Sequence, residues 1–245
     1  MKRMTRFGLF LCILPLIWLF AACERTGEDE YVEKSFTLPA FDTLRIAGPV
    51  NVYLSMDTAN SMIVSGSPVI VDNVKYTIDN GTLTLESTYQ YKMFKPASNK
   101  AGIFLNLASI SRIDIAESCG LKSVGIIRTG ELGLVVMAKY ADVDLEVDCA
   151  SFYYWDYSLS GGMVRLAGET GTLRIWNFSL MTVDAGGLTS DKAIIENTAR
   201  SPCYIRAIKE LKYSIFGQGD IYYFGKPDSI KRGKVTSSGR LIQAD

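Results

Sequence analysis

Four acidic residues alternate with apolar ones in the middle of the chain. Asp142, Asp144, Glu146 and Asp148 are separated by single valine or leucine residues, so in a β-strand all four carboxylates point to one face. Clustered oxygen ligands bind hard cations such as calcium, and paired carboxylates cleave glycosidic bonds. Side chains two residues apart on a strand are about 6.5–7 Å apart, however, which is too far for four of them to hold one ion. We therefore expect a solvated strand face and no metal, with these four residues as a weak candidate cation site.

The densest aromatic segment follows at residues 152–157, and its side chains alternate between the two faces of the expected strand. One tryptophan and one phenylalanine further along belong to an outward column of the repeat described below. Exposed aromatic rings stack on sugar rings or bury against a partner protein. The alternative is that a loop or a neighbouring subunit covers them, or that they stiffen the sheet by cross-strand pairing. The candidate contact residues are Tyr153, Trp155, Tyr157, Trp176 and Phe216.

Nucleophilic and metal chemistry have few residues to draw on. The sequence contains no histidine, which excludes Ser-His-Asp and Cys-His triads, histidine zinc sites and the commonest general base. Cys119, Cys149 and Cys203 are an odd set without CxxC spacing, so at most one disulfide could form, and buried apolar thiols are the expectation. We expect no catalytic residue and no cofactor.

The elements that would position these side chains are indicated by an imprecise repeat between residues 172 and 224. Segments 172–177, 192–197 and 212–217 align at a step of 20 residues, which puts Ile175, Ile195 and Ile215 in one column. Two places further on, each segment has an asparagine or glycine, residues that tolerate positive φ at low cost. A β-branched residue before a turn-former is what stacked coils need, because each coil buries its apolar face only against a neighbour. The pattern predicts an all-β parallel β-helix, or solenoid.

The segment 36–86 reads instead as short strands with antiparallel character. Asn80-Gly81 supplies the two positive-φ residues of a type I′ hairpin turn between two alternating stretches. A solenoid needs a cover on its terminal coil because an open coil exposes unpaired backbone groups. We expect one β-helix domain over residues 36–242, with residues 36–86 as its capping portion.

Residues 1–22 have the character of a signal peptide. Three basic residues precede an apolar run that is too short to span a membrane, and the run ends at Ala21-Ala22-Cys23. This ending resembles a bacterial lipoprotein processing site, which implies cleavage before Cys23 and lipid attachment to it. Residues 23–35 are polar and acidic and are expected to form a flexible tether. The alternative is ordinary secretion with a free Cys23 thiol.

The charge balance argues against nucleic-acid binding. The formal net charge of the whole chain is zero, and removal of residues 1–22 takes away three basic side chains and no acid, which leaves −3. Without a basic field there is no electrostatic drive toward phosphate backbones.

The assembled pattern resembles the putative auto-transporter adhesin head (GIN) domain family of Bacteroidetes-like bacteria, over nearly all of residues 36–242. The matching text is Phe41-Asp-Thr-Leu-Arg-Ile-Ala-Gly-Pro-Val-Asn-Val-Tyr-Leu54, Asn80-Gly-Thr-Leu-Thr-Leu85, Ser158-Leu-Ser-Gly-Gly162 and Phe216-Gly-Gln-Gly-Asp-Ile-Tyr-Tyr-Phe-Gly-Lys-Pro227. In the middle, where the family favours repeated Ser-Gly turns, this chain has asparagine-containing turns. The resemblance implies a right-handed β-helix in the cell envelope with an adhesin-like role, and it supplies no catalytic residues.

The expected function is a non-catalytic display surface on an outer-membrane lipoprotein, whose partners are the membrane through its lipid and a glycan or envelope protein. A carbohydrate-active β-helix enzyme, a glycosidase or lyase, is the main alternative, by analogy of fold class. A periplasmic scaffold or regulatory partner is a further alternative. An enzyme would show converging carboxylates in a groove, whereas a display protein would show scattered surface charges.

A first prediction concerns the anchor. Cys23→Ala removes the only thiol at the expected processing site, so the protein should become unlipidated and soluble. Membrane fractionation and metabolic lipid labelling of cells producing each form would measure this. If the variant still partitions with membranes, the anchor assignment is wrong.

Overall fold

We describe the protein from a computed structural model, which describes residues 31–88, 100–157 and 159–245. The expected signal peptide, Cys23 and residues 24–30 of the tether lie outside these residues. Strands dominate the described part, and its one helix is a single short turn. The elements are β1 (Val32–Thr37), β2 (Thr43–Ala47), β3 (Asn51–Met56), β4 (Ser61–Gly66), α1 (Pro68–Asp72), β5 (Val74–Asp79), β6 (Thr82–Ser87), β7 (Gly102–Leu107), β8 (Arg112–Ile115), β9 (Cys119–Val136), β10 (Tyr140–Asp156), β11 (Gly161–Asn177), β12 (Leu180–Asn197), β13 (Cys203–Ile215), β14 (Ile221–Phe224), β15 (Ser229–Val235) and β16 (Leu241–Gln243).

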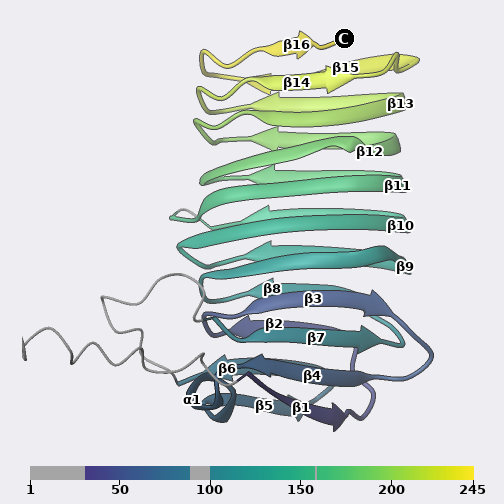
Figure 1. Ribbon diagram of the computed structural model, residues 1–245. Coiled ribbons are helices and arrows are strands. Elements are labelled where there is room, and N and C mark those ends of the chain that lie inside the picture. Colours follow the sequence, from purple (N-terminus) through teal and green to yellow (C-terminus); the bar gives the residue numbers. More distant parts are fainter. Residues whose placement is uncertain (1–30, 89–99, 158) are drawn as a thin grey trace, which may run out of the picture. The chain divides into compact units, whose positions relative to one another are not determined.

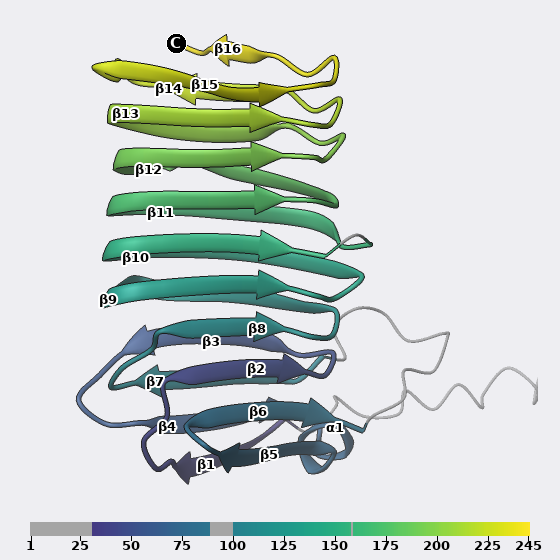
Figure 2. The same cartoon turned by 180° about the vertical axis from the view of Figure 1, so that it is seen from behind.

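The coils of a right-handed parallel β-helix occupy the larger part of residues 31–245 (Figures 1 and 2). Strands β9 to β13 are long because each one bends around a corner and so contributes to two faces of the stack. Strands β10, β11 and β12 each pair in parallel with one long strand below and one above along most of their length. Strand β9 pairs with the short β3 and β8 below it, and β13 pairs with the short β14 and β15 above it. The predicted solenoid is confirmed.

The antiparallel part lies at the amino-terminal end. Strand β4 pairs antiparallel with β1 and β7, and β5 pairs antiparallel with β6 through the predicted hairpin, where Asn80 and Gly81 have φ values of 47° and 75°. Strands β2 and β3, by contrast, pair in parallel with β6, β8, β7 and β9, so they belong to the first coils rather than to a separate cap. The expected tether also ends earlier than residue 35, because Val32–Thr37 already forms β1.

Columns of buried side chains fill the interior of the stack. Ile175 lies in register with Ile195 on the coil above and with Tyr154 on the coil below, and none of the three exposes more than 1% of its surface. Apolar side chains at equivalent positions of adjacent coils remove one another from water when they stack. This burial supplies most of the free energy that holds the coils together. Phe152 and Tyr154 of the aromatic segment are fully buried in these columns.

The predicted column is wrong at its third member. Ile195 pairs with Tyr213, and Ile215 pairs with Asn197, so the last long coil is offset by two residues from the expected alignment. The register between β12 and β13 shifts between Ala185 and Thr189 and again between Ser190 and Lys192. The coil between Ile195 and its partner Tyr213 is therefore shorter than 20 residues. A fixed step of 20 residues from Ile195 ends at Ile215, two residues beyond the true partner.

The three cysteines of the domain are free and buried, as expected. Burial raises the pKa of the Cys119 thiol to about 12 and also raises the pKa of Cys203, because the thiolate would lose its solvation. These thiols therefore stay protonated at neutral pH and pack as small apolar groups.

The isoleucine column gives a second prediction. Ile195→Asp places an unpaired carboxylate between Ile175 and Tyr213, and should lower the free energy of unfolding by about 3–5 kcal/mol or prevent folding. Ile194→Asp is the matched control, because the neighbouring side chain points outward and is only partly buried. Urea unfolding followed by circular dichroism measures both. Equal stabilities of the two variants would contradict the assigned inward face.

Candidate functional site

An apolar depression lies where three aromatic side chains meet, at the end of the second halves of β10 and β11. Trp155 on β10 is the direct register partner of Trp176 on β11, and Phe178 follows in the next turn. The three rings line a depression of about 250 Å³. Trp155 is 43% exposed, and its ring stacks on Tyr157 with 5.4 Å between centroids and 12° between planes. We call Trp155, Tyr157, Trp176 and Phe178 the aromatic edge site.

Two of the five predicted contact residues lie elsewhere. Tyr153 covers the strand below it: a Cβ atom at Gly133 would lie 2.0 Å from the tyrosine ring, so this side chain fills the space above a glycine. Phe216 is not in the tryptophan column, because Glu196 pairs with Ser214 and not with Phe216. The structure thus brings together Trp155, Tyr157 and Trp176, and leaves out Tyr153 and Phe216.

Phe178 is the contact residue that sequence reasoning missed. It lies in a turn, where the alternation of inward and outward residues is interrupted, so periodicity does not place it. Its position is set by a backbone contact instead: the Phe178 N–H donates to Asp156 Oδ1 at 2.6 Å. The signal in the sequence is Asp156 itself, an acid at a position where the following coils have Asn177 and Asn197.

A buried polar column supports this turn from the inside. Asp156, Asn177 and Asn197 are fully buried, and Asn177 and Asn197 are in register. The Asp156 carboxylate also accepts hydrogen bonds from the Tyr154 hydroxyl at 3.0 Å and from the Ser179 hydroxyl. Burial raises the pKa of the Asp156 carboxyl, and the hydrogen bonds from Ser179, Phe178 and Tyr154 oppose that effect.

The two asparagines support the next turns as hydrogen-bond donors. Asn177 Nδ2 donates to the Met181 carbonyl at 3.1 Å, and Asn197 Nδ2 donates to the Gly219 carbonyl at 2.9 Å. Each inward side chain therefore ties the end of one strand to the start of the next strand or the turn beyond it. This column fixes the turns that carry Phe178 and its neighbours.

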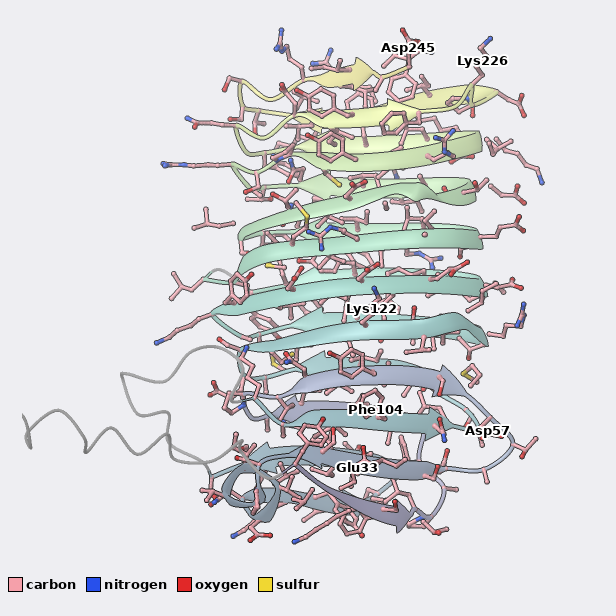
Figure 3. All side chains as sticks on the ribbon, viewed as in Figure 1. Glu33, Asp57, Phe104, Lys122, Lys226 and Asp245 are labelled. Atoms are coloured by element: carbon pink, nitrogen blue, oxygen red, sulfur yellow. The ribbon has the colours of Figure 1, made fainter. Side chains whose placement is uncertain are left out.

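The four acidic side chains named as a weak candidate cation site stay apart along one strand face. Asp142, Asp144, Glu146 and Asp148 are exposed along β10, on the expected single face, and they do not converge. Three of them have basic partners: Arg165 lies 2.9 Å from Asp142, Lys122 lies 3.5 Å from Asp144 and Arg128 lies 3.6 Å from Asp148 (Lys122 is labelled in Figure 3). In the described ranges, no three acidic or cysteine side chains lie close enough to hold a metal ion.

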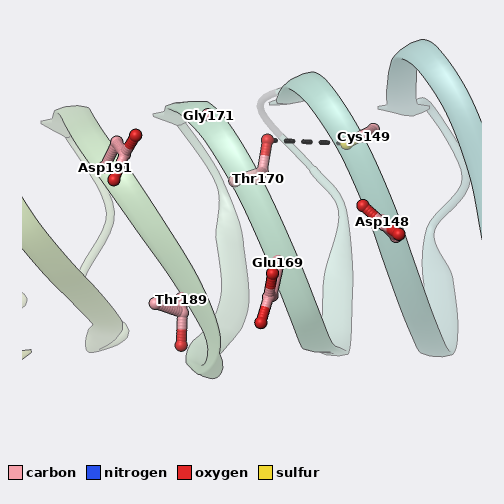
Figure 4. Close-up of a pocket in the computed structure, with 7 residues that line it drawn as sticks. All are labelled: Asp148, Cys149, Glu169, Thr170, Gly171, Thr189 and Asp191. Atoms are coloured by element: carbon pink, nitrogen blue, oxygen red, sulfur yellow. Dashed lines mark hydrogen bonds between the residues drawn. The ribbon is translucent and has the colours of Figure 1, made fainter.

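A separate depression of about 300 Å³ lies at a corner of the coils (Figure 4). Asp148, Glu169 and Asp191 come to it from three successive coils, and the Cys149 thiol donates to Thr170 Oγ1 at 3.5 Å. All three carboxylates are exposed, and Lys209 lies 2.9 Å from Asp191. Acid–base catalysis needs a proton donor and acceptor held in different environments, whereas these exposed groups share a solvated corner.

No helix in the described part of the chain has the length and apolar character needed to span a membrane.

Comparisons with known proteins identify relatives of the fold. A family model described as "Putative auto-transporter adhesin, head GIN domain" matches residues 40–227. A crystal structure of a "putative adhesin" from Bacteroides fragilis has a TM-score of 0.78 at 15% identity, and the match covers 89% of this chain and 98% of that one. A "putative lipid binding protein" from Parabacteroides distasonis and a "putative adhesin" from Parabacteroides merdae match over the same shares, with TM-scores of 0.60 and 0.54 at 14% and 15% identity. At these identities the likeness shows the fold alone. No curated protein matches the sequence significantly.

The buried carboxyl gives a third prediction. Because its pKa is raised in the folded state, Asp156 binds a proton more tightly there than in the unfolded chain. Its favourable contribution to the free energy of unfolding is therefore complete at pH values below the ordinary carboxyl pKa of 3.8. That contribution is lost as the pH rises through the raised pKa of the folded state. The loss is about 1.4 kcal/mol for each unit by which the pKa is raised.

In the Asp156→Asn variant the side chain is neutral at every pH and is of the type found in the neighbouring coils. The variant therefore does not lose stability through ionisation of this side chain. The stability of the natural protein relative to Asp156→Asn should fall as the pH is raised from just below 4. Urea unfolding of both proteins across a pH series gives this difference. A relative stability that rises with pH would mean that the folded environment favours the carboxylate.

Proposed function

The chain belongs to the head GIN domain family, and we propose that it is a non-catalytic binding protein of the bacterial cell envelope that uses the aromatic edge site to hold a partner protein. In this proposal Cys23 carries a lipid that anchors the protein in the outer membrane, and residues 24–31 space the β-helix from it. A partner on the cell or its surroundings then docks on one edge of the stack.

The aromatic edge site is the observation that carries the proposal. Rigid aromatic rings that bury large apolar areas dominate the energetics of protein interfaces, and tryptophan is among the residues most enriched there. Here two tryptophans occupy adjacent rungs and line one apolar depression with Phe178. Trp155 is exposed and Trp176 is partly buried, whereas Phe152 and Tyr154 of the same segment as Trp155 are fully buried.

Neighbouring exposed residues extend the apolar surface beyond a single small ligand. Leu159 and Leu180 lie in and after the adjoining turns and are 81% and 58% exposed. Tyr140 and Leu180 are both register partners of Gly161, so they stand on either side of a rung without a side chain. Exposed apolar side chains from several coils suit a protein partner.

The distribution of acids supports a binding role over the alternative of a glycosidase or lyase. Asp142, Asp144 and Asp148 are exposed and paired with basic side chains, and the buried Asp156 faces the interior of the stack. A glycosidase needs two carboxyl groups on either side of the scissile bond in an open groove. Here the exposed carboxylates form surface ion pairs, and the buried one accepts hydrogen bonds within the fold.

The fourth prediction tests the site by substitution. Purified protein carrying Trp155→Ala together with Trp176→Ala should bind envelope vesicles of the producing bacterium at least about tenfold more weakly than the natural protein, because central interface aromatics each contribute about 2 kcal/mol or more. Surface plasmon resonance with immobilised protein measures the apparent affinity. Tyr31→Ala is the matched control, since Tyr31 is 67% exposed at the amino-terminal end of the described chain.

Unchanged binding by the double variant, with its thermal unfolding also unchanged, would remove the aromatic edge site from the proposal. Binding that disappears after protease treatment of the vesicles would agree with a protein partner. Binding that survives the treatment and still depends on both tryptophans would point to a glycan or lipid instead.

A further inference from the structure

A second groove lies on the other face of the stack, where a glycine interrupts a row of polar side chains. Gly120 on β9 is the register partner of Asn51 on β3 and of Asp142 on β10. Because Gly120 contributes no side chain, a groove of about 250 Å³ opens between these rungs. A Cβ atom at Gly120 would lie 2.8 Å from Asn51 Oδ1, so even a small side chain would enter this space.

One wall of the groove is an aromatic ring. Tyr53 stacks on Phe104 with 4.8 Å between ring centroids and 14° between planes, and Phe104 is labelled with Lys122 on the same face in Figure 3. Strand β3 lies between β7, which carries Phe104, and β9, which carries Gly120 and Lys122. Phe104 covers Tyr53 from the β7 side, and on the β9 side the register partner of Tyr53 is Lys122, which lines the groove with it.

The charges around the groove cancel. Asp142 pairs with Arg165 at 2.9 Å and Asp144 pairs with Lys122 at 3.5 Å, and all four side chains line the groove. An anionic ligand would meet the two carboxylates and a cationic ligand the two basic groups, whereas a neutral ligand with hydroxyls can donate to the first and accept from the second. Within the described residues neither the Asn51 carboxamide nor the Tyr53 hydroxyl has a hydrogen-bond partner, so both remain available.

We propose that this groove binds one ring of a neutral glycan. A neutral sugar ring has an apolar C–H face, which packs against the part of Tyr53 that lines the groove, and a rim of hydroxyls, which both donate and accept hydrogen bonds. The groove offers both kinds of contact in a volume that holds one such ring. It lies on the first half of β10, across the corner from the aromatic edge site on the second half, so its function is independent of that site.

Affinity electrophoresis tests the proposal with defined probes. The purified protein is run in native gels containing hydroxyethyl cellulose, yeast mannan or dextran as neutral probes, and polygalacturonate as an anionic probe. We expect retention by at least one neutral polysaccharide and none by polygalacturonate. Gly120→Leu fills the groove and should weaken retention at least tenfold. Gly130→Leu is the matched control on the same strand, because nothing lies within 4 Å of a Cβ atom there.

A second pair of variants keeps the test independent of folding. Asp142→Asn with Arg165→Gln removes an exposed ion pair from the groove and should also weaken retention at least tenfold. Asp191→Asn with Lys209→Gln removes an equally short exposed pair outside the groove and should not. Protein with Trp155→Ala and Trp176→Ala should bind as the natural protein does. Failure of all three neutral probes, preference for polygalacturonate, or retention unchanged in both groove variants would overturn the proposal.

Discussion

The constraint on which the rest of the structure depends is that each coil must lie in register on the one below. A parallel ladder pairs every backbone position with its neighbour, so inward side chains form continuous columns such as Tyr154, Ile175 and Ile195. A coil can bury its apolar face only through this register. The same register decides which outward side chains become neighbours. Both candidate binding sites are therefore products of the ladder, although their residues are far apart in the sequence.

The buried polar column links the interior to the surface. Asp156 holds the Phe178 backbone, and Asn177 and Asn197 close the following turns with their own hydrogen bonds. These hydrogen bonds favour one arrangement of each turn, although Asn177 Oδ1 is buried without a hydrogen-bond partner among the described residues. The aromatic edge site consequently has a rigid support: Trp155 precedes the buried acid, and Phe178 is bound to it. A loop without such support would not keep two tryptophans and a phenylalanine around one depression.

Much of the fold could be predicted from the sequence because the spacing of the repeated residues indicates which residues of adjacent coils pair. The pairing of Ile175 with Ile195 and the Asn80-Gly81 hairpin follow from local periodicity and turn chemistry. The position of Ile215 could not, because the chain shortens a coil at its bends, and no periodic pattern marks where residues are left out. The column of Phe216 is unpredictable for the same reason.

The candidate sites were less predictable than the fold. The outward position of Trp155 and Trp176 follows from alternation, but Phe178 is placed by a hydrogen bond in a turn. The groove at Gly120 combines β3 with β9 and β10, and only the parallel pairing of these strands shows that Asn51 and Asp142 flank the same glycine. Sequence reasoning found the acids of β10 but not the basic side chains from neighbouring rungs that neutralise them.

Strand β15, near the carboxyl end of the stack, pairs with β13 and has no other strand partner in the described chain. Its exposed residues include Lys231, Arg232 and Lys234. Lys231 pairs with Glu210 at 3.0 Å, which leaves Arg232 and Lys234 to bring like charges together if β15 of a second copy paired with it at the strand spacing of about 4.8 Å. The basic side chains of this edge strand therefore disfavour pairing between two copies of β15.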